Sequence, residues 1–202
     1  MRGQETEGNA DSEARYNGPA YDVMTTEQKR IRESILRSRT STGLAGPFGP
    51  WLAVPSIAEP AQALGQACRF GTSLTFRESE LVILLTGAKF ESQTEFEIHR
   101  AEAVRAGLAM NVIDSIPHGK NFNLENVESN LCTKLDAAKE IMIVKFAAEL
   151  LASNTVSDQT YNDTLNTVNG NHAIIVEITS IIGYYAYVAY TLNIFKIPFP
   201  TT

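Results

Sequence analysis

The stretch from Arg77 to His99 constrains this chain most, because it places ionisable side chains inside an apolar run. Residues 81–85 read LVILL and directly follow Glu80. A helix this apolar is expected to be buried, and a carboxylate at its head needs a partner there. A second arm begins near Ser92 and carries Glu95 and His99 four residues apart, hence on one helix face.

The spacing predicts a helical hairpin that brings these groups together. The break between the two arms falls at residues 87–91, about equally far from Glu80 and His99. Antiparallel packing then brings these two residues level, with Glu95 one turn nearer to the bend. A buried acid beside a Glu–His pair can support proton transfer, because histidine changes charge near neutral pH. Glu80, Glu95 and His99 are therefore candidate catalytic residues.

Other interpretations of these three residues stay open. Ser92 to Glu95 fits the S-x-x-E capping box, in which Glu95 would only close a helix start, as we expect Glu78 to do one helix earlier. A Glu–His pair four apart is also common on exposed faces, where it stabilises a helix by roughly 0.2–0.5 kcal/mol. A metal site is a third reading, but metal sites in helical bundles favour a Glu-x-x-His spacing. We expect no metal and no cofactor.

Three motifs together point to a family. They are Arg77-Glu78-Ser79-Glu80-Leu81, the run from Thr94 to His99, and Ala106-Gly107-Leu108. With these motifs, the segment from Gly46 to Pro200 resembles the carboxymuconolactone decarboxylase superfamily, which includes the alkylhydroperoxidase-like proteins. The resemblance implies an all-α, alkylhydroperoxidase-like helical bundle. It also implies a single domain with a central helical hairpin, a pocket between helices, and assembly as a homotrimer or hexamer.

The chain departs from the pattern of this family at two points. The peroxidase branch uses a cysteine pair at the positions that Ser92 and Glu95 occupy here, and neither side chain can form a thiolate or a disulfide. We therefore expect no dithiol peroxidase chemistry. Thr94 stands where decarboxylase-like members commonly carry an aromatic residue, so the substrate stays open.

The resemblance implies a cofactor-independent acid–base enzyme, a decarboxylase-like lyase acting on a carboxylated lactone or a related carbonyl compound. His99 would protonate carbon, Glu95 would set the tautomer of His99, and Glu80 would position His99 or shuttle protons. The same residues could run an isomerase, dehydratase or cyclase reaction on a carbonyl substrate of secondary metabolism. A non-catalytic binding protein that keeps the fold is the remaining alternative.

Five further residues are candidates for substrate binding. Phe48 lies in a Gly/Pro-rich loop at residues 40–50 and Trp51 directly follows it, and both need burial somewhere, as pocket walls or as core plugs. Arg100 could anchor a substrate carboxylate or remain a surface charge. Tyr184 and Tyr187 are spaced three apart in the C-terminal helix and would give a tyrosine-rich pocket.

Composition narrows the class of protein. A chain of 202 residues with net charge −6 is unsuited to binding nucleic acid, which needs concentrated Lys and Arg. The two cysteines, Cys68 and Cys132, lie too far apart to suggest a metal pair and read as buried small hydrophobes. Residues 1–18 are polar and predict a disordered leader without a secretory signal, ahead of one domain at 19–202. We expect a cytoplasmic protein.

Periodicity predicts the remaining helices. They cover residues 22–38, 55–69, 110–116, 135–152, 157–168 and 173–195, and residues 121–131 read as irregular. In the second of these helices we expect Ile57, Ala61 and Leu64 to face inward. The last one is long enough to span a bilayer, which takes about 20 residues. Its tyrosines, Glu177 and regularly spaced small residues instead favour a core or subunit-contact helix, so we expect no membrane partner.

Overall fold

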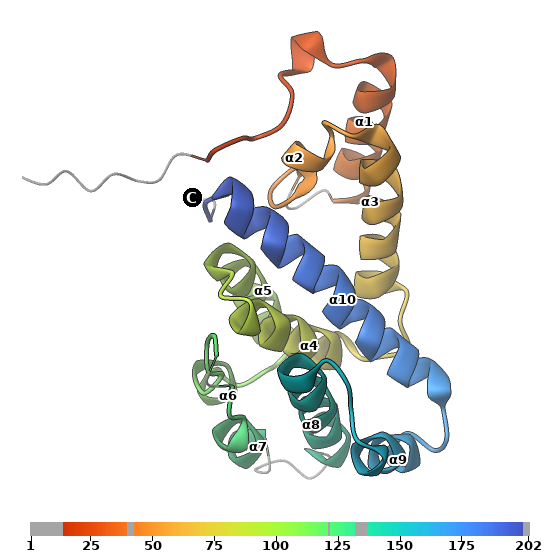
Figure 1. Ribbon diagram of the computed structural model, residues 1–202, viewed down its shortest axis with the longest axis vertical. Coiled ribbons are helices and arrows are strands. Elements are labelled where there is room, and N and C mark those ends of the chain that lie inside the picture. The colour runs from red at the N-terminus through yellow and green to blue at the C-terminus, as the bar shows by residue number, and fades with distance from the viewer. Residues whose placement is uncertain (1–13, 40–42, 121, 132–136, 200–202) are drawn as a thin grey trace, which may run out of the picture.

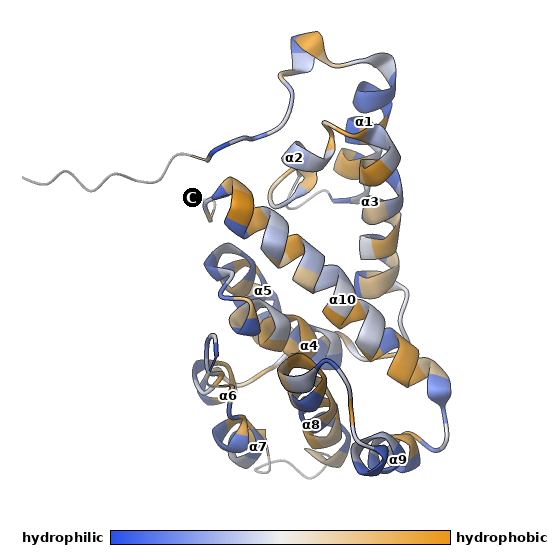
Figure 2. Ribbon diagram, viewed as in Figure 1, coloured by the Kyte–Doolittle hydropathy of each residue, from blue (hydrophilic) through white to orange (hydrophobic). Residues whose placement is uncertain are grey.

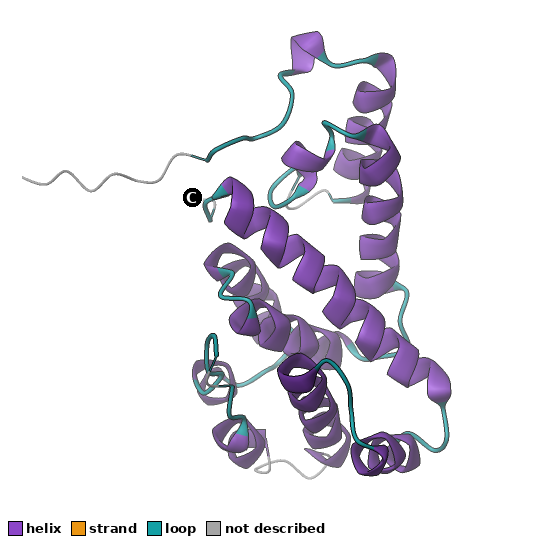
Figure 3. Cartoon of the chain, viewed as in Figure 1, coloured by secondary structure: helices purple, strands orange, loops and turns teal. Residues whose placement is uncertain are grey.

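The computed structural model describes residues 14–39, 43–120, 122–131 and 137–199. Within these residues every regular element is helical (Figure 3), which confirms the predicted all-α class. After a 3-10 turn at Tyr21–Val23, the α-helices are α1 (Thr26–Ser38), α2 (Phe48–Trp51), α3 (Pro55–Phe70), α4 (Phe76–Lys89), α5 (Gln93–Arg105), α6 (Met110–Asp114), α7 (Glu125–Leu131), α8 (Ala137–Ser153), α9 (Asp158–Thr167) and α10 (His172–Phe195).

Helix α4 lies at the centre and packs against α5, α8 and α10 (Figure 1). It begins with the predicted capping box, in which Thr75 and Glu78 each accept a hydrogen bond from the other's backbone N–H. Every residue from Glu78 to Ala88 is buried. Because this run offers no polar face to water, neighbouring helices have to cover it on all sides.

The α4–α5 hairpin is the predicted central feature, with a turn slightly later than expected. Helix α4 continues through Gly87 to Lys89, and the reversal occurs at Glu91, whose φ of 52° is left-handed. The N–H of Ser92 donates to the carbonyl of Gly87, which closes the turn. Helix α5 ends before Gly107 (φ 83°), the predicted glycine beyond a helix C-terminus.

Helix α10 crosses the front of the bundle in Figure 1 and packs against α3, α4, α5, α8 and α9. By length and composition alone it could cross a membrane, but half of its most apolar window is buried within the protein. Such burial is typical of the core helix of a soluble protein. Figure 2 shows hydrophobic residues on α4, α8 and α10, whereas α9 is mostly hydrophilic. Glu177 of α10 accepts hydrogen bonds from the N–H and hydroxyl of Ser73.

Two predictions about local structure are wrong. The segment predicted to be irregular, residues 121–131, contains α7, because Val127 and Leu131 form a one-sided apolar face that packs toward α6 and α8. On α3, Ile57 and Leu64 point outward, at 47% and 48% exposure. The buried positions of α3 lie one residue further along: Ala58, Gln62, Gly65 and Cys68.

The N-terminal segment is tied to the far end of the chain. The N–H of Arg15 donates to the carbonyl of Phe195 at 2.8 Å, and the Tyr16 ring contacts the ring of Phe195. Gly18 (φ 99°) lies so close to Gly49 that a Cβ at residue 18 would be 2.2 Å from the Gly49 carbonyl oxygen. Residues 14–18 therefore pack on the helical domain, although they fall in the predicted leader; residues 1–13 of that leader lie outside the described residues.

Candidate active site

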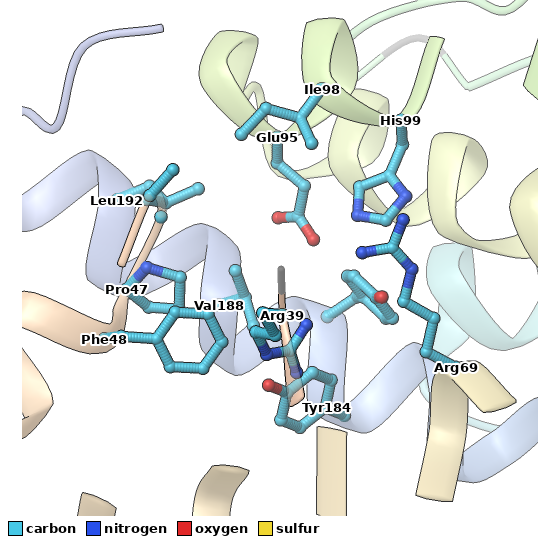
Figure 4. A pocket seen from close by; sticks show the side chains of 13 residues that line it. Arg39, Pro47, Phe48, Arg69, Glu95, Ile98, His99, Tyr184, Val188 and Leu192 are labelled. Carbon is cyan, nitrogen blue, oxygen red and sulfur yellow. The ribbon is translucent and has the colours of Figure 1, made fainter. Parts of the chain in front are cut away.

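A cavity of about 230 Å³ lies between α5, α10 and the loop that precedes α2. The ends of α1 and α3 close its remaining side (Figure 4). Its lining combines apolar walls with ionisable side chains: Arg39, Ala45, Gly46, Pro47, Phe48, Arg69, Glu95, Ile98, His99, Tyr184, Tyr185, Val188 and Leu192.

The hairpin brings Glu80 and His99 together as the spacing predicts. The Nδ1 atom of His99 lies 2.7 Å from Oε2 of Glu80, within hydrogen-bond distance. Glu80 is fully buried, and its other oxygen, Oε1, has no partner. With Nδ1–H donating to this carboxylate, Nε2 is the ring nitrogen left for a substrate. The ring of Tyr185 packs edgewise on His99, with centroids 5.0 Å apart, and holds the imidazole in place.

Glu95 projects from α5 into the cavity (Figure 4) and is only 1% exposed. The alternative capping role is wrong, because the Ser92 side chain makes no capping hydrogen bond and its hydroxyl is itself buried without a partner. Neither carboxyl oxygen of Glu95 has a hydrogen-bond partner among the residues that the structure describes. Burial therefore holds the pKa of the Glu95 carboxyl well above its usual range and favours the protonated, neutral acid.

Two arginines line the same cavity, and the sequence analysis did not single them out. Arg39 stands at the C-terminal end of α1, and Arg69 lies in the last turn of α3. The Nε atoms of both are buried and have no hydrogen-bond partner within the described parts of the chain. No local pattern marks either residue, since a basic side chain in the last turn of a helix ordinarily serves only to cap it.

The aromatic residues divide into cavity walls and supports behind them. Phe48 and Tyr184 line the cavity as predicted, whereas Trp51 and Tyr187 do not. The Trp51 ring stacks on Tyr187 at 4.7 Å between centroids, and Trp51 Nε1–H donates to the Thr191 hydroxyl. This pair packs behind the wall, since the Trp51 ring also contacts Phe48 and Tyr184 edgewise.

Gly65 on α3 makes room for Tyr184. A Cβ at residue 65 would lie 2.1 Å from the Tyr184 hydroxyl oxygen, so only glycine allows the phenol to occupy this position. Burial raises the pKa of Tyr184, which therefore remains a neutral phenol in the cavity wall.

The predicted substrate anchor Arg100 lies outside the cavity. Its guanidinium donates to Asp114 at 2.7 Å on the outer side of α5. Residues three or four apart share a helix face, but Arg100 lies five residues after Glu95. Its side chain therefore points to a different side of α5 from the buried acid. Among the described residues, no three or more His, Cys, Asp or Glu side chains are grouped so that they could hold a metal ion.

Comparison with known proteins supports the fold independently of these residues. No family model matches the chain, and no curated protein matches it in sequence. A solved structure does match, with a TM-score of 0.70 and 16% identity over 93% of this chain and 92% of the other. It is described as the alkylhydroperoxidase AhpD core of an uncharacterized peroxidase-related protein from Ralstonia eutropha.

The chain has the AhpD-like fold. This confirms the architecture that the sequence resemblance implies. Fold similarity at this identity carries no activity with it, so the chemistry has to be argued from the cavity. Within its AhpD-like fold, this chain places a neutral carboxylic acid, an imidazole held by a carboxylate, two guanidinium groups and two phenols around one small cavity. These groups can donate, accept and relay protons beside a bound carbonyl compound.

The protonation of Glu95 makes a prediction about stability. In the unfolded chain the carboxyl loses its proton near pH 4.5, whereas the folded protein keeps it to much higher pH. The folded state thus binds more protons above pH 4.5, and the free energy of unfolding falls as pH rises. Glu95→Gln removes this cost, so its stability relative to wild type should increase as the pH rises above about 4.5 in urea unfolding.

The matched control is Glu97→Gln on the same helix, where the carboxylate is accessible and pairs with Arg100. Its stability difference from wild type should show no comparable upward trend over the same pH range. A Glu95→Gln difference that is flat with pH would mean that Glu95 ionises normally in the folded protein.

Proposed function

We propose that this protein is a cofactor-independent acid–base enzyme, decarboxylase-like, acting on a carboxylated lactone or a related carbonyl compound. The observation that carries the proposal is Glu95, a buried acid with no hydrogen-bond partner, in the same cavity as His99. Leaving a polar group unsatisfied costs about 1–3 kcal/mol. A protein that keeps such a group facing a cavity has a use for it there, as a proton donor to a ligand.

The roles differ from those expected from the sequence, because Glu80 takes over the setting of the His99 tautomer and Glu95, rather than His99, protonates carbon. Glu80, not Glu95, contacts His99 Nδ1 and sets the tautomer. Glu95 holds a proton at neutral pH and is the better candidate for the general acid. In the proposed reaction the bond to the leaving carboxylate breaks and carbon dioxide departs. The electron pair moves into the adjacent carbonyl to form an enolate, and Glu95 then protonates carbon. The Glu95 carboxylate left behind regains its proton from solvent water, which His99 can relay by accepting a proton at Nε2 and passing it on.

The arrangement also suits an isomerase, dehydratase or cyclase. These reactions need a base and an acid at the same time, and the imidazole of His99 beside the buried carboxylic acid of Glu95 can supply both. A non-catalytic binding role has less support. The Glu80–His99 pair could serve structure alone, but that role leaves the unpaired oxygens of Glu95 without an explanation.

The test is a panel of carboxylated lactones and β-keto acids, with carbon dioxide release and loss of substrate both measured. A positioned acid or base contributes typically about 10²–10⁴-fold, so we expect His99→Gln and Glu95→Gln each to lower kcat by roughly that factor. His118→Gln is the matched control, since His118 is exposed and lies outside the cavity lining. Folded Glu95→Gln and His99→Gln variants that turn over at the wild-type rate would contradict the proposal.

Peroxide reduction is tested in the same series, because the structural neighbour is named peroxidase-related. In this chain Ser92 and Glu95 stand where the resembled peroxidase branch has its cysteine pair, and Cys68 is a free, buried cysteine. Thiol-dependent consumption of an alkyl hydroperoxide by the wild type, lost in Cys68→Ser, would favour that chemistry over the proposed one.

We also propose a homo-oligomer, a trimer or hexamer. The outer face of α10 exposes Val176, Tyr190 and Ile194 by 54–62% each, and Phe70 at the end of α3 is 60% exposed. Large apolar side chains grouped on an outer face are typical of a subunit contact. Light scattering after size exclusion should give a multiple of the 22.2 kDa chain, reduced by Val176→Glu together with Ile194→Glu. A monomeric wild type at micromolar concentration would refute this.

A further inference from the structure

The cavity contains two positive charges with little to balance them. The Arg69 guanidinium lies 3.4 Å from Glu102, but the same carboxylate lies 3.2 Å from Arg105, so one anion serves two cations. Arg39 forms no ion pair with any residue that the structure describes; its guanidinium lies over the Phe48 ring, 4.4 Å from the centroid. Glu95, the acid of α5 that lines the cavity, is a poor counter-ion, because burial favours its protonated, neutral form.

The two guanidinium groups also line the same cavity closely enough for the charge of one to act on the other. Burial lowers the pKa of Arg39, and the charge of Arg69 lowers it further, whereas the nearby phenols of Tyr184 and Tyr185 act in the opposite direction. Bringing two cations together in a largely buried site is unfavourable unless an anion joins them. Figure 4 shows both side chains reaching into the cavity toward the space below the Glu95 carboxyl.

We propose that Arg39 and Arg69 form an oxyanion site that binds and stabilises the enolate oxygen of the reacting compound. The proposal deepens the function proposed above and rests on it for the reaction. It assigns the ligand class as a small planar enolate or phenolate, whose oxygen carries the negative charge.

The direction in which charge moves during the reaction favours this oxygen over the leaving carboxylate. As the carbon–carboxylate bond breaks, its electron pair forms the enolate double bond and the carbonyl electrons move onto oxygen. A cation on the leaving carboxylate would stabilise the ground state and oppose its loss, whereas a cation on the carbonyl oxygen gains interaction in the transition state. When carbon is protonated the oxygen electrons restore the carbonyl, so no oxidant or reductant is needed.

The geometry divides the cavity in a matching way. The cationic groups come from α1 and α3, while the proton-donating groups Glu95 and His99 come from α5. Ile98, Val188 and Leu192 form an apolar wall on which a carboxylate is poorly solvated and readily lost. A substrate with its carbonyl oxygen toward Arg39 and Arg69 thus exposes its reacting carbon to the acid on the other side.

The test uses para-nitrophenol, a planar analogue of an enolate, as an optical probe that needs no turnover. At a pH below its solution pKa, the wild type should bind it as the yellow phenolate. Arg39→Gln and Arg69→Gln should each weaken phenolate binding roughly 10- to 100-fold, as expected for loss of a charged hydrogen bond. Arg39→Lys keeps the charge but loses the planar fork, so its affinity for the phenolate should lie between those of the wild type and Arg39→Gln.

Arg100→Gln is the control, because Arg100 lies outside the cavity and pairs with Asp114. Arg69→Gln leaves Glu102 paired with Arg105, and a thermal unfolding curve for each variant shows whether it is folded. Binding of the probe as the colourless phenol by the wild type, or phenolate affinity unchanged in folded Arg39→Gln and Arg69→Gln, would overturn the proposal.

Benzoate separates this site from one for the carboxylate. Arginine-dependent binding of benzoate without bound phenolate would mean that the arginines hold a carboxylate, and would overturn the oxyanion assignment. Failure of the proposed function looks different: phenolate binding would depend on both arginines, while no member of the substrate panel would be turned over.

Discussion

The hydrogen bond between Glu80 and His99 is the interaction on which the site depends. Glu80 sits within the most deeply buried helix of the protein, where an unpaired carboxylate would be strongly destabilising. A polar partner on a neighbouring helix stabilises the buried carboxylate, and His99 of α5 provides that partner at 2.7 Å. That contact fixes the register of the hairpin. It also fixes which side of α5 faces α10, and so directs Glu95 into the cavity rather than into solvent.

The two buried glutamates of the hairpin thereby acquire different chemistry. Glu80 has a hydrogen-bond partner and orients an imidazole, whereas Glu95 has none and keeps its proton. Pairs of acids whose environments differ in this way are a recurrent means of obtaining an acid and a base at one pH. The arginines complete the set by placing positive charge where an anion would form. In the function we propose, these groups serve proton transfer, with Ser92 and Glu95 at the positions where the resembled peroxidase branch carries its cysteine pair.

The sequence predicts the hairpin well because its signals are local. An apolar run headed by an acid, a turn, and a Glu–His pair four apart leave few ways of folding the segment, and the 3.6-residue period places the side chains. Local periodicity does not mark Arg39 and Arg69. These residues lie at the ends of two different helices, 30 residues apart in sequence, and only tertiary packing brings them to the same cavity. On α3 the larger apolar residues were predicted to face inward. The inward face is instead the one that carries Gly65, whose missing side chain makes room for Tyr184. Trp51 and Tyr187 were expected at the cavity, but their mutual stacking places them behind it.

The assignment of Glu95 as the general acid depends on the protonation of its carboxyl group, which infrared difference spectroscopy measures. The spectrum of wild type minus Glu95→Gln at neutral pH should contain the carbonyl band of a protonated carboxylic acid, displaced in heavy water and persisting well above pH 4.5. Carboxylate bands in its place at neutral pH would show that Glu95 is ionised in the folded protein, and would contradict its assignment as the general acid.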